Sequence, residues 1–203
     1  MDDLSTIPDY GLGWLDASGP WSEIVLSTRV RLARNLQGHA IGARSRVNDR
    51  EAVLNQVKQA IRDSSLLSKA TLWHLADVVP RTQRILLERR LVSEDLLRGG
   101  NGAPNRGTAV VLSASDPTSV MVNEEDHLRL QSLLSGLRLQ DAWSLVDRMD
   151  EELGNRLPMA YHQEFGFLTS CPTNVGTGLR ASVLMHLPGL VLTKEIGQVL
   201  KGL

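Results

Sequence analysis

The spacing of apolar residues along the chain predicts short strands alternating with helices. Residues 48–64 are the clearest helix, because apolar side chains recur there at helical spacing, and residues 139–153 repeat the pattern. The β-rich runs 108–113 and 119–122 flank a Ser-Asp-Pro-Thr turn, which predicts an antiparallel hairpin. Further strands are expected over residues 23–26, 71–76, 166–170 and 179–187, and a final helix over residues 193–200.

The segments between these elements are less regular. The first 22 residues are punctuated by Gly and Pro and are expected to form an irregular lead-in (residues 1–22) to one domain over residues 23–203. Residues 98–107 (RGGNGAPNRG) predict a loop, and residues 83–97 give an ambiguous pattern. The mixture of hairpins and helices indicates an α+β fold, with a mainly antiparallel sheet flanked by helices.

Composition narrows the class of protein. The 203 residues carry Lys+Arg 22 against Asp+Glu 23, and this net charge of -1 argues against a generally basic nucleic-acid binder. The single cysteine, Cys171, excludes an internal disulfide framework and a thiolate zinc cage. The acidic start and the lack of an apolar run of about 18 residues argue against a signal peptide and a membrane span. We therefore expect a soluble, cytoplasmic protein.

The basic residues are strongly biased, since 18 are arginine and 4 are lysine. A GC-rich genome would produce this bias, because arginine codons are GC-rich. Arginine also suits two-pronged recognition of phosphate or carboxylate. Where the arginines cluster therefore matters more than how many there are.

The common nucleotide-binding patterns are absent or weak. The sequence has no P-loop. Residues 176–181 match the G-x-G-x-x-[GA] dinucleotide pattern, and Glu195 follows downstream. That pattern needs a helix after the glycines, whereas residues 179–187 alternate mostly as a strand does. The match does not favour a dinucleotide site.

Two polar segments could carry chemistry, and each also has a structural interpretation. Residues 123–129 (NEEDHLR) place three acids in a row, which fits a solvated turn or acids that face cations or a metal. A zinc site fails there, because His127 has no His or Cys partner at ligand spacing. Residues 169–180 (TSCPTNVGTGLR) form a loop whose backbone N–H groups could hold an anion, although a lone cysteine such as Cys171 is commonly a small buried apolar residue. The other histidines, which are expected to be structural, are His39, His74, His162 and His186.

Four segments taken together resemble one family. EIVLSTRVRLARN, LLERRLVS, VNEEDHLRLQ and FLTSCPTNVGTGLRASVLMHLP stand in the order found in the ATP:guanido phosphotransferases, the family of creatine and arginine kinases. CPTNVGTGLRASV followed by MHLPGLVLT is most similar to the bacterial protein-arginine kinase branch. The resemblance runs from about residue 14 to the end of the chain. It implies the catalytic-domain fold of guanido kinases, which is of the creatine kinase/glutamine synthetase-like type.

In this family arginines hold ATP, so the resemblance implies a nucleotide site on the matching residues. Arg29, Arg31, Arg129 and Arg180 would clamp the phosphates, because phosphoryl transfer depends on positioning and charge neutralisation. Arg90 stands where the family commonly has a histidine near the adenine. Mg²⁺ would be held mostly by phosphates and water, so no protein metal ligand is expected. The other residues expected to line the nucleotide are Ser27, Thr28, Val30, Ala181, Ser182, Val183 and Leu184.

The resemblance also implies two catalytic residues. Glu125 matches the carboxylate that grips the acceptor guanidinium. Since a guanidinium keeps its proton near neutral pH, a hydrogen-bonded carboxylate is needed to orient the attacking nitrogen and accept that proton. Cys171 matches the active-site cysteine, whose thiolate would lie against the same guanidinium.

The family continues beyond the matching residues, so the catalytic domain at residues 23–203 is expected to be partial at its C-terminus. The remaining part supplies another nucleotide-binding arginine and a mobile loop over the acceptor. A sheet edge left open in this way favours homo-oligomers. Three functions stay open: a protein-arginine kinase, a truncated non-catalytic remnant that binds nucleotide or partners, and a small-molecule phosphagen kinase, which is the least favoured.

The first of these functions implies particular partners. A protein-arginine kinase would transfer the γ-phosphoryl group of ATP to arginines exposed on protein substrates. The resemblance further implies a role in bacterial stress response, with a zinc-containing activator protein and a Clp ATPase/protease as partners. We expect neither nucleic acid nor membrane among them.

Overall fold

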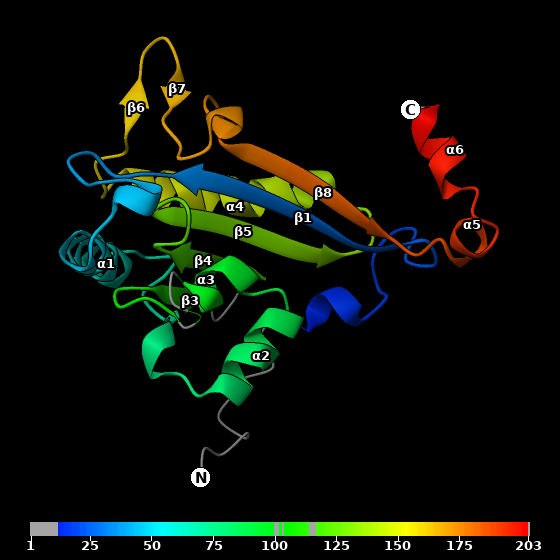
Figure 1. Cartoon of the computed structure of the whole chain (residues 1–203), viewed down its shortest axis with the longest axis horizontal. Helices are drawn as coiled ribbons and strands as arrows, with labels where there is room; N and C mark the ends of the chain where they lie inside the picture. The colour runs from blue at the N-terminus through cyan, green and yellow to red at the C-terminus, as the bar shows by residue number, and fades with distance from the viewer. Residues whose placement is uncertain (1–11, 100–101, 103, 114–116, 203) are drawn as a thin grey trace.

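A six-stranded antiparallel sheet forms the centre of the computed structural model, which describes residues 12–99, 102, 104–113 and 117–202 (Figure 1). Its strand order is β2-β3-β4-β5-β1-β8. The strands are β1 (Val25–Arg34), β2 (Thr71–His74), β3 (Ala109–Leu112), β4 (Thr118–Val122), β5 (Leu128–Ser135) and β8 (Leu179–Met185), and a separate hairpin pairs β6 (Tyr161–His162) with β7 (Gly166–Phe167). The expected antiparallel α+β fold is confirmed.

The helices lie on both sides of this sheet and beyond its end. In Figure 1, α4 runs behind β1, α3 lies in front of β3 and β4, α2 lies below them, and α5 and α6 extend past the end of β8. Their bounds are α1 (Val47–Arg62), α2 (Pro80–Glu88), α3 (Glu94–Arg98), α4 (Leu139–Gly154), α5 (Pro188–Leu192) and α6 (Ile196–Lys201). Single 3-10 turns are η2 (Gly13–Leu15), η3 (Gly42–Arg44), η4 (Leu75–Asp77) and η5 (Pro172–Asn174).

Two clusters of buried apolar side chains pack the helices against the sheet. Neither cluster covers one part of the second sheet face. Successive side chains of a strand point to opposite faces. Val30 and Leu32 of β1 therefore point to the face that α1 and α4 close, in one buried cluster. On the opposite face, Met121 of β4 packs in a second cluster with residues of α2 and α3, and this cluster ends at β4. The part of that face formed by β5, β1 and β8 carries the arginines described below.

The helices and the hairpin follow the sequence pattern more closely than the strands do. The predicted helices at residues 48–64 and 139–153 are α1 and α4, and β3 and β4 form the predicted hairpin, although residues 114–116 of its turn lie outside the described residues. The ambiguous residues 83–97 fall mainly in α2 and α3. The final helix predicted over residues 193–200 corresponds to α6, and a further short helix, α5, precedes it.

Three strand predictions need correction. β1 extends through Arg34, well beyond residues 23–26, because its arginines alternate with buried apolar residues. β5 has no counterpart in the prediction, because Leu133 and Leu134 are both buried and break the alternation expected of a strand with one solvated face. The strand expected over residues 166–170 is only the two residues of β7.

No helix among the described residues is both long and apolar enough to cross a bilayer.

Candidate active site

Arginines from three neighbouring strands share the free part of the sheet face. In the β1–β8 pairing, Arg31 lies directly opposite Arg180, and Arg29 lies opposite Ser182. In the β1–β5 pairing, Arg129 lies opposite Ala33. The side chain of Ala33 points to the same face of β1 as those of Arg29 and Arg31, because the three residues alternate along the strand. Because opposed residues of an antiparallel pair point to the same face, the four arginines predicted to clamp phosphate point to one face.

These arginines perturb one another electrostatically. Burial lowers the pKa of Arg31 to about 10, and the positive charges of Arg29, Arg180 and Arg129 add to the effect. The pKa of Arg29 is lowered first by burial and then by the charges of Arg90 and Arg180. The Nε atoms of Arg29 and Arg31 are buried without a hydrogen-bond partner among the described residues. Concentrated positive charge with unpaired donors is an arrangement that an anion would stabilise.

A shallow hollow of about 50 Å³ opens between these strands. It is lined by Arg31, Arg129 and Arg180, together with Asn174 and Gly178 of the loop before β8. A side chain at Gly178 would not fit, because its φ is +63° and an added Cβ would lie 2.6 Å from the Ala33 oxygen. Gly178 thus lets the loop approach β1 and close one side of the hollow. Since β8, a strand, follows this glycine, the dinucleotide pattern is not a dinucleotide fold.

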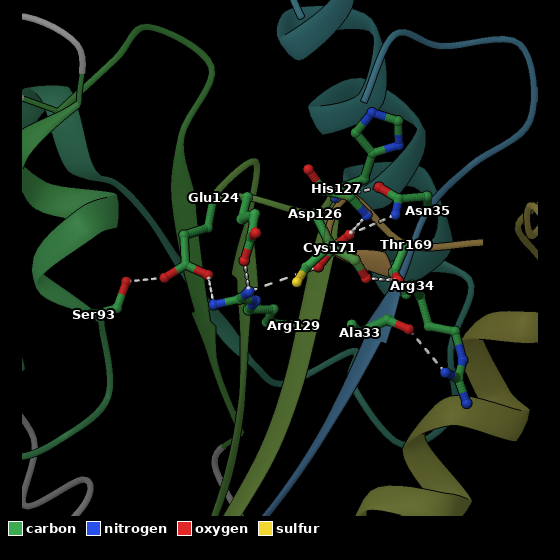
Figure 2. A network of polar contacts seen from close by, with 12 residues as sticks. Ala33, Arg34, Asn35, Ser93, Glu124, Asp126, His127, Arg129, Thr169 and Cys171 are labelled. Atoms are coloured by element: carbon green, nitrogen blue, oxygen red, sulfur yellow. Dashed lines mark hydrogen bonds and ion pairs between the residues drawn. The ribbon is translucent and has the colours of Figure 1, made fainter. Parts of the chain in front are cut away.

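Arg129 connects this hollow to the acidic turn between β4 and β5. Its two terminal nitrogens pair separately with the carboxylates of Glu124 and Glu125, and Nη2 also lies 3.7 Å from Asp126 Oδ2 (Figure 2). The Glu124 side chain is only 2% exposed, and Ser93 donates a hydrogen bond to it. Glu125 is 45% exposed, so it is the acid of this turn that a second molecule can reach. Sequence reasoning missed the roles of Glu124 and Ser93, although Glu124 stands in the same motif.

A second and larger hollow of about 730 Å³ lies on the other side of the acidic turn. Glu124, Glu125 and Asp126 line it, and Asp95 of α3 adds a fourth acid. Arg50, the basic residue of the lining, uses its guanidinium to donate hydrogen bonds to the carbonyl oxygens of Ser45 and Arg106. The lining is acidic and open, which suits a cationic ligand.

Cys171 lies beside the acidic turn, in the loop before η5. Its thiol is half-buried and lies 3.0 Å from the Thr173 hydroxyl. The backbone N–H of the preceding residue, Ser170, donates to Asp126 Oδ1 at 2.7 Å. Cys171, Asp126 and Arg129 thus belong to one polar network (Figure 2). The structure brings together the two segments that hold the predicted catalytic residues.

Arg90 lies at the end of the arginine cluster nearest the N-terminal turn η2. Its guanidinium carbon lies 5.2 Å from the centroid of the buried Trp14 ring. Its backbone oxygen accepts a hydrogen bond from Gln131 of β5, which shares the free face. Arg90 therefore joins the cluster although it comes from the segment after α2.

The other residues predicted to line the nucleotide divide between the two faces. The β1–β8 pairing puts three of them on the same face as Arg29, namely Ser27, Ser182 and Leu184. Thr28 instead donates a hydrogen bond to the Gly136 oxygen and accepts one from the Arg138 N–H, which joins β1 to the start of α4. The side chains of four further predicted residues point to the opposite face of the sheet, so their part in nucleotide binding stays a prediction; they are Thr28, Val30, Ala181 and Val183.

The described residues contain no group of three or more His, Cys, Asp or Glu side chains arranged to hold a metal ion. The three neighbouring acids of residues 124–126 face Arg129 instead.

Curated relatives match nearly all of the chain. It is 46% identical over 193 residues to the protein-arginine kinase of Moorella thermoacetica (strain ATCC 39073 / JCM 9320). This match covers 94% of this chain and 54% of that protein. It is 37% identical over 196 residues to the protein-arginine kinase of Bacillus subtilis (strain 168). This match covers 96% of this chain and 52% of that protein. The chain spans about half the length of the curated relatives it matches.

Solved structures of guanido kinases share the fold. The duplicated taurocyamine kinase from Schistosoma mansoni with bound transition state analog components matches with a TM-score of 0.75 and 26% identity. That match covers 95% of this chain and 27% of the other. Lombricine kinase matches in fold, with a TM-score of 0.71 and 24% identity over 87% of this chain and 53% of the other.

Most of the chain also matches the sequence model of one protein family. Residues 52–203 match the model described as ATP:guanido phosphotransferase, C-terminal catalytic domain. The matched range includes the acidic turn, the Cys171 loop and β8, and the arginines of β1 complete the same face. The chain therefore belongs to the ATP:guanido phosphotransferase family.

Proposed function

We propose that this chain transfers the γ-phosphoryl group of ATP to the guanidino group of arginine residues in proteins. One observation carries the proposal: Arg129 lines the arginine-rich hollow, Glu125 lines the acidic hollow, and the two side chains form an ion pair. A site for a polyanion and a site for a cation thus meet at a single contact. Transfer of a phosphoryl group to a guanidinium needs this adjacency.

The arginine cluster would bind Mg·ATP through its phosphates. Arg29, Arg31, Arg129 and Arg180 can offer forked, charged donors from three strands, and the bound anion would satisfy the Nε atoms that are unpaired here. Arg90 and Trp14 lie beyond Arg29, where they would face the base. Fixed positive charge around the transferred group is the main protein contribution to this chemistry.

Glu125 and Cys171 would act on the acceptor. The attacking guanidino nitrogen forms a bond to the γ-phosphorus, the bond between that phosphorus and the bridging oxygen breaks, and ADP leaves. The nitrogen loses a proton as the new bond forms, and the half-exposed Glu125 carboxylate would accept it. Cys171, from the adjoining loop, would lie against the same guanidinium and help hold it in line.

The acidic hollow favours an arginine carried by a polypeptide. Its volume of about 730 Å³ and its open lining leave room for residues that flank the acceptor arginine. The named relatives are protein-arginine kinases, which supports the same substrate class.

The wider role that we propose rests on the sequence resemblance. It includes a cytoplasmic location, action in bacterial stress response, a zinc-containing activator protein and a Clp ATPase/protease as partners, and homo-oligomers. β8 is an edge strand of the sheet with exposed Leu179 and Met185, which is consistent with self-association.

A transfer assay tests the proposal. The chain is incubated with radiolabelled Mg·ATP and casein, and acid-labile phosphate on arginine is measured. We expect labelling by the wild-type chain, none by Glu125→Gln, and about 10- to 100-fold less by Cys171→Ala. Glu164→Gln, an exposed acid near β7, is the matched control and should label normally. Nucleotide binding without labelling would contradict the proposal and favour the non-catalytic remnant.

A further inference from the structure

Asn35 connects three segments that are distant in the sequence. It follows β1 and is completely buried. Its side-chain nitrogen donates to Asp126 Oδ1 at 2.7 Å and to the Leu168 oxygen at 3.0 Å, while its side-chain oxygen accepts from the His127 N–H at 2.8 Å. Both side-chain protons and the oxygen are thus engaged, which is typical of a buried amide that fixes its surroundings.

Asp126 extends the connection to the segment that carries the cysteine. Its Oδ1 accepts from Asn35 and from the Ser170 N–H, each at 2.7 Å. Asp126 directly follows Glu125 in the chain, and Ser170 directly precedes Cys171. Figure 2 shows Asn35 and Asp126 within the network that also includes Arg129 and Cys171.

The acidic turn needs an anchor that does not depend on Arg129. In this structure Arg129 pairs with both Glu124 and Glu125. In the proposed function the same guanidinium would also contact a phosphate, which would compete for its donors. The contacts of Asn35 and Asp126 would hold the turn in place while Arg129 changes partners.

We propose that Asn35 and Asp126 form a clasp, defined by the Asn35–Asp126, Asn35–Leu168 and Asp126–Ser170 hydrogen bonds, that positions Glu125 and Cys171 relative to each other. This inference rests on the proposed function for its kinetic consequence. Asn35 is then a positioning residue, which touches neither ATP nor the acceptor. A displacement of about 1 Å at a reacting group can cost about 100-fold in rate.

The first test needs neither ATP nor an acceptor. Cys171 is the single cysteine, so alkylation by iodoacetamide reports on its loop alone. We expect Asn35→Ala to release the loop and raise the alkylation rate at least threefold at fixed pH. Asn55→Ala, at an exposed asparagine of α1, is the matched control and should leave the rate unchanged. An unchanged rate in folded Asn35→Ala would overturn the clasp, whether or not the chain is a kinase.

The second test separates positioning from general loss of structure. We expect Asn35→Ala to lower kcat for transfer at least tenfold while the Kd for Mg·ATP stays within twofold of wild type. A parallel loss of ATP affinity would contradict a positioning role. If the wild-type chain transfers nothing, the proposed function fails, and the alkylation result still decides the clasp.

A charge swap covers the case in which Asn35→Ala does not fold. Asn35→Asp alone would place two carboxylates at hydrogen-bond distance and should raise alkylation. Adding Asp126→Asn restores a donor-acceptor pair between the two positions and leaves an acceptor for the Ser170 N–H, although position 35 then has no donor for the Leu168 oxygen. We therefore expect partial recovery, with the double variant alkylated at least twofold more slowly than Asn35→Asp. No recovery would overturn the inference.

Discussion

Arg31 and Arg180 lie directly opposite each other where β1 pairs with β8. Like charges at opposed positions of an antiparallel pair destabilise a sheet. Arg29 and Arg129 add positive charge nearby, so the pKa of Arg31 falls to about 10, with burial as the main cause. The free protein thus accepts an electrostatic cost where a polyanion would relieve it, an arrangement common at functional sites.

Replacing Arg31 should therefore stabilise the free protein. Arg31→Met keeps the length of the side chain and removes its charge, and we expect the free energy of unfolding to rise by about 1 kcal/mol. For a chain of this size that is an increase in Tm of about 2–4 °C, measured by thermal melting without nucleotide. Arg148→Met, on the exposed face of α4, is the control and should change little. A lower Tm for Arg31→Met would show that the cluster is not under repulsive strain.

The buried partner of Arg129 should matter for stability as well. Glu124 is 2% exposed and accepts contacts from Arg129 and Ser93, so Glu124→Gln removes the buried charge that faces Arg129 Nη1, while Glu125 and Asp126 stay near Nη2. We expect a loss of about 1–3 kcal/mol in the free energy of unfolding, measured by urea denaturation. Glu51→Gln removes an exposed partner of Arg106 and should cost less than about 1 kcal/mol. Equal losses would contradict the anchoring role of Glu124.

His127 should make the free energy of unfolding depend on pH. Burial lowers its pKa below the usual value of 6.5, and its Nδ1 accepts from the Leu36 N–H while Nε2 lies 3.0 Å from the Ala40 oxygen. Below about pH 6.5 the unfolded chain binds a proton that the folded chain does not, so the free energy of unfolding falls as the pH falls. His127→Gln removes this term and should give a shallower slope between pH 7 and pH 5 in urea titrations.

The control for this prediction is His186→Gln, because His186 is exposed at the end of β8. That variant should keep the slope of wild type. If His127→Gln also kept it, His127 would not be the group that titrates.

Arg90 should affect the base of the nucleotide more than its phosphates. It lies over Trp14 at the end of the cluster, in the place where family members commonly have a histidine near the adenine. We expect Arg90→Ala to weaken Mg·ATP binding about three- to tenfold through lost stacking, with tripolyphosphate binding changed less than twofold. Equal weakening of both ligands would assign Arg90 to the phosphates.

The sequence predicted the helices whose apolar residues recur at a clear spacing, and it predicted the site segments that match family motifs. α1 and α4 follow from helical spacing, and the arginines of β1 and β8 follow from the family motifs. β5 did not follow, because both Leu133 and Leu134 are buried and no strict alternation remains. The register that places Arg31 opposite Arg180 depends on pairing between strands far apart in the chain, which no local pattern specifies.

The contacts that hold the site are hidden from sequence for the same reason. Asn35 and Asp126 are 91 positions apart, and neither residue type signals a buried network by itself. Glu124 and Glu125 are adjacent and identical in type, yet one is buried and the other is exposed. Tertiary packing makes that distinction.

Calorimetric titration of the chain with Mg·ATP shows whether the arginine face of β1, β5 and β8 binds the triphosphate. We expect wild type to bind and Arg31→Met to bind at least about tenfold more weakly, because a charge-assisted hydrogen bond to phosphate is lost. Arg148→Met should bind as wild type does. Unchanged affinity in Arg31→Met would show that the shared arginine face of β1, β5 and β8 is not where the triphosphate binds.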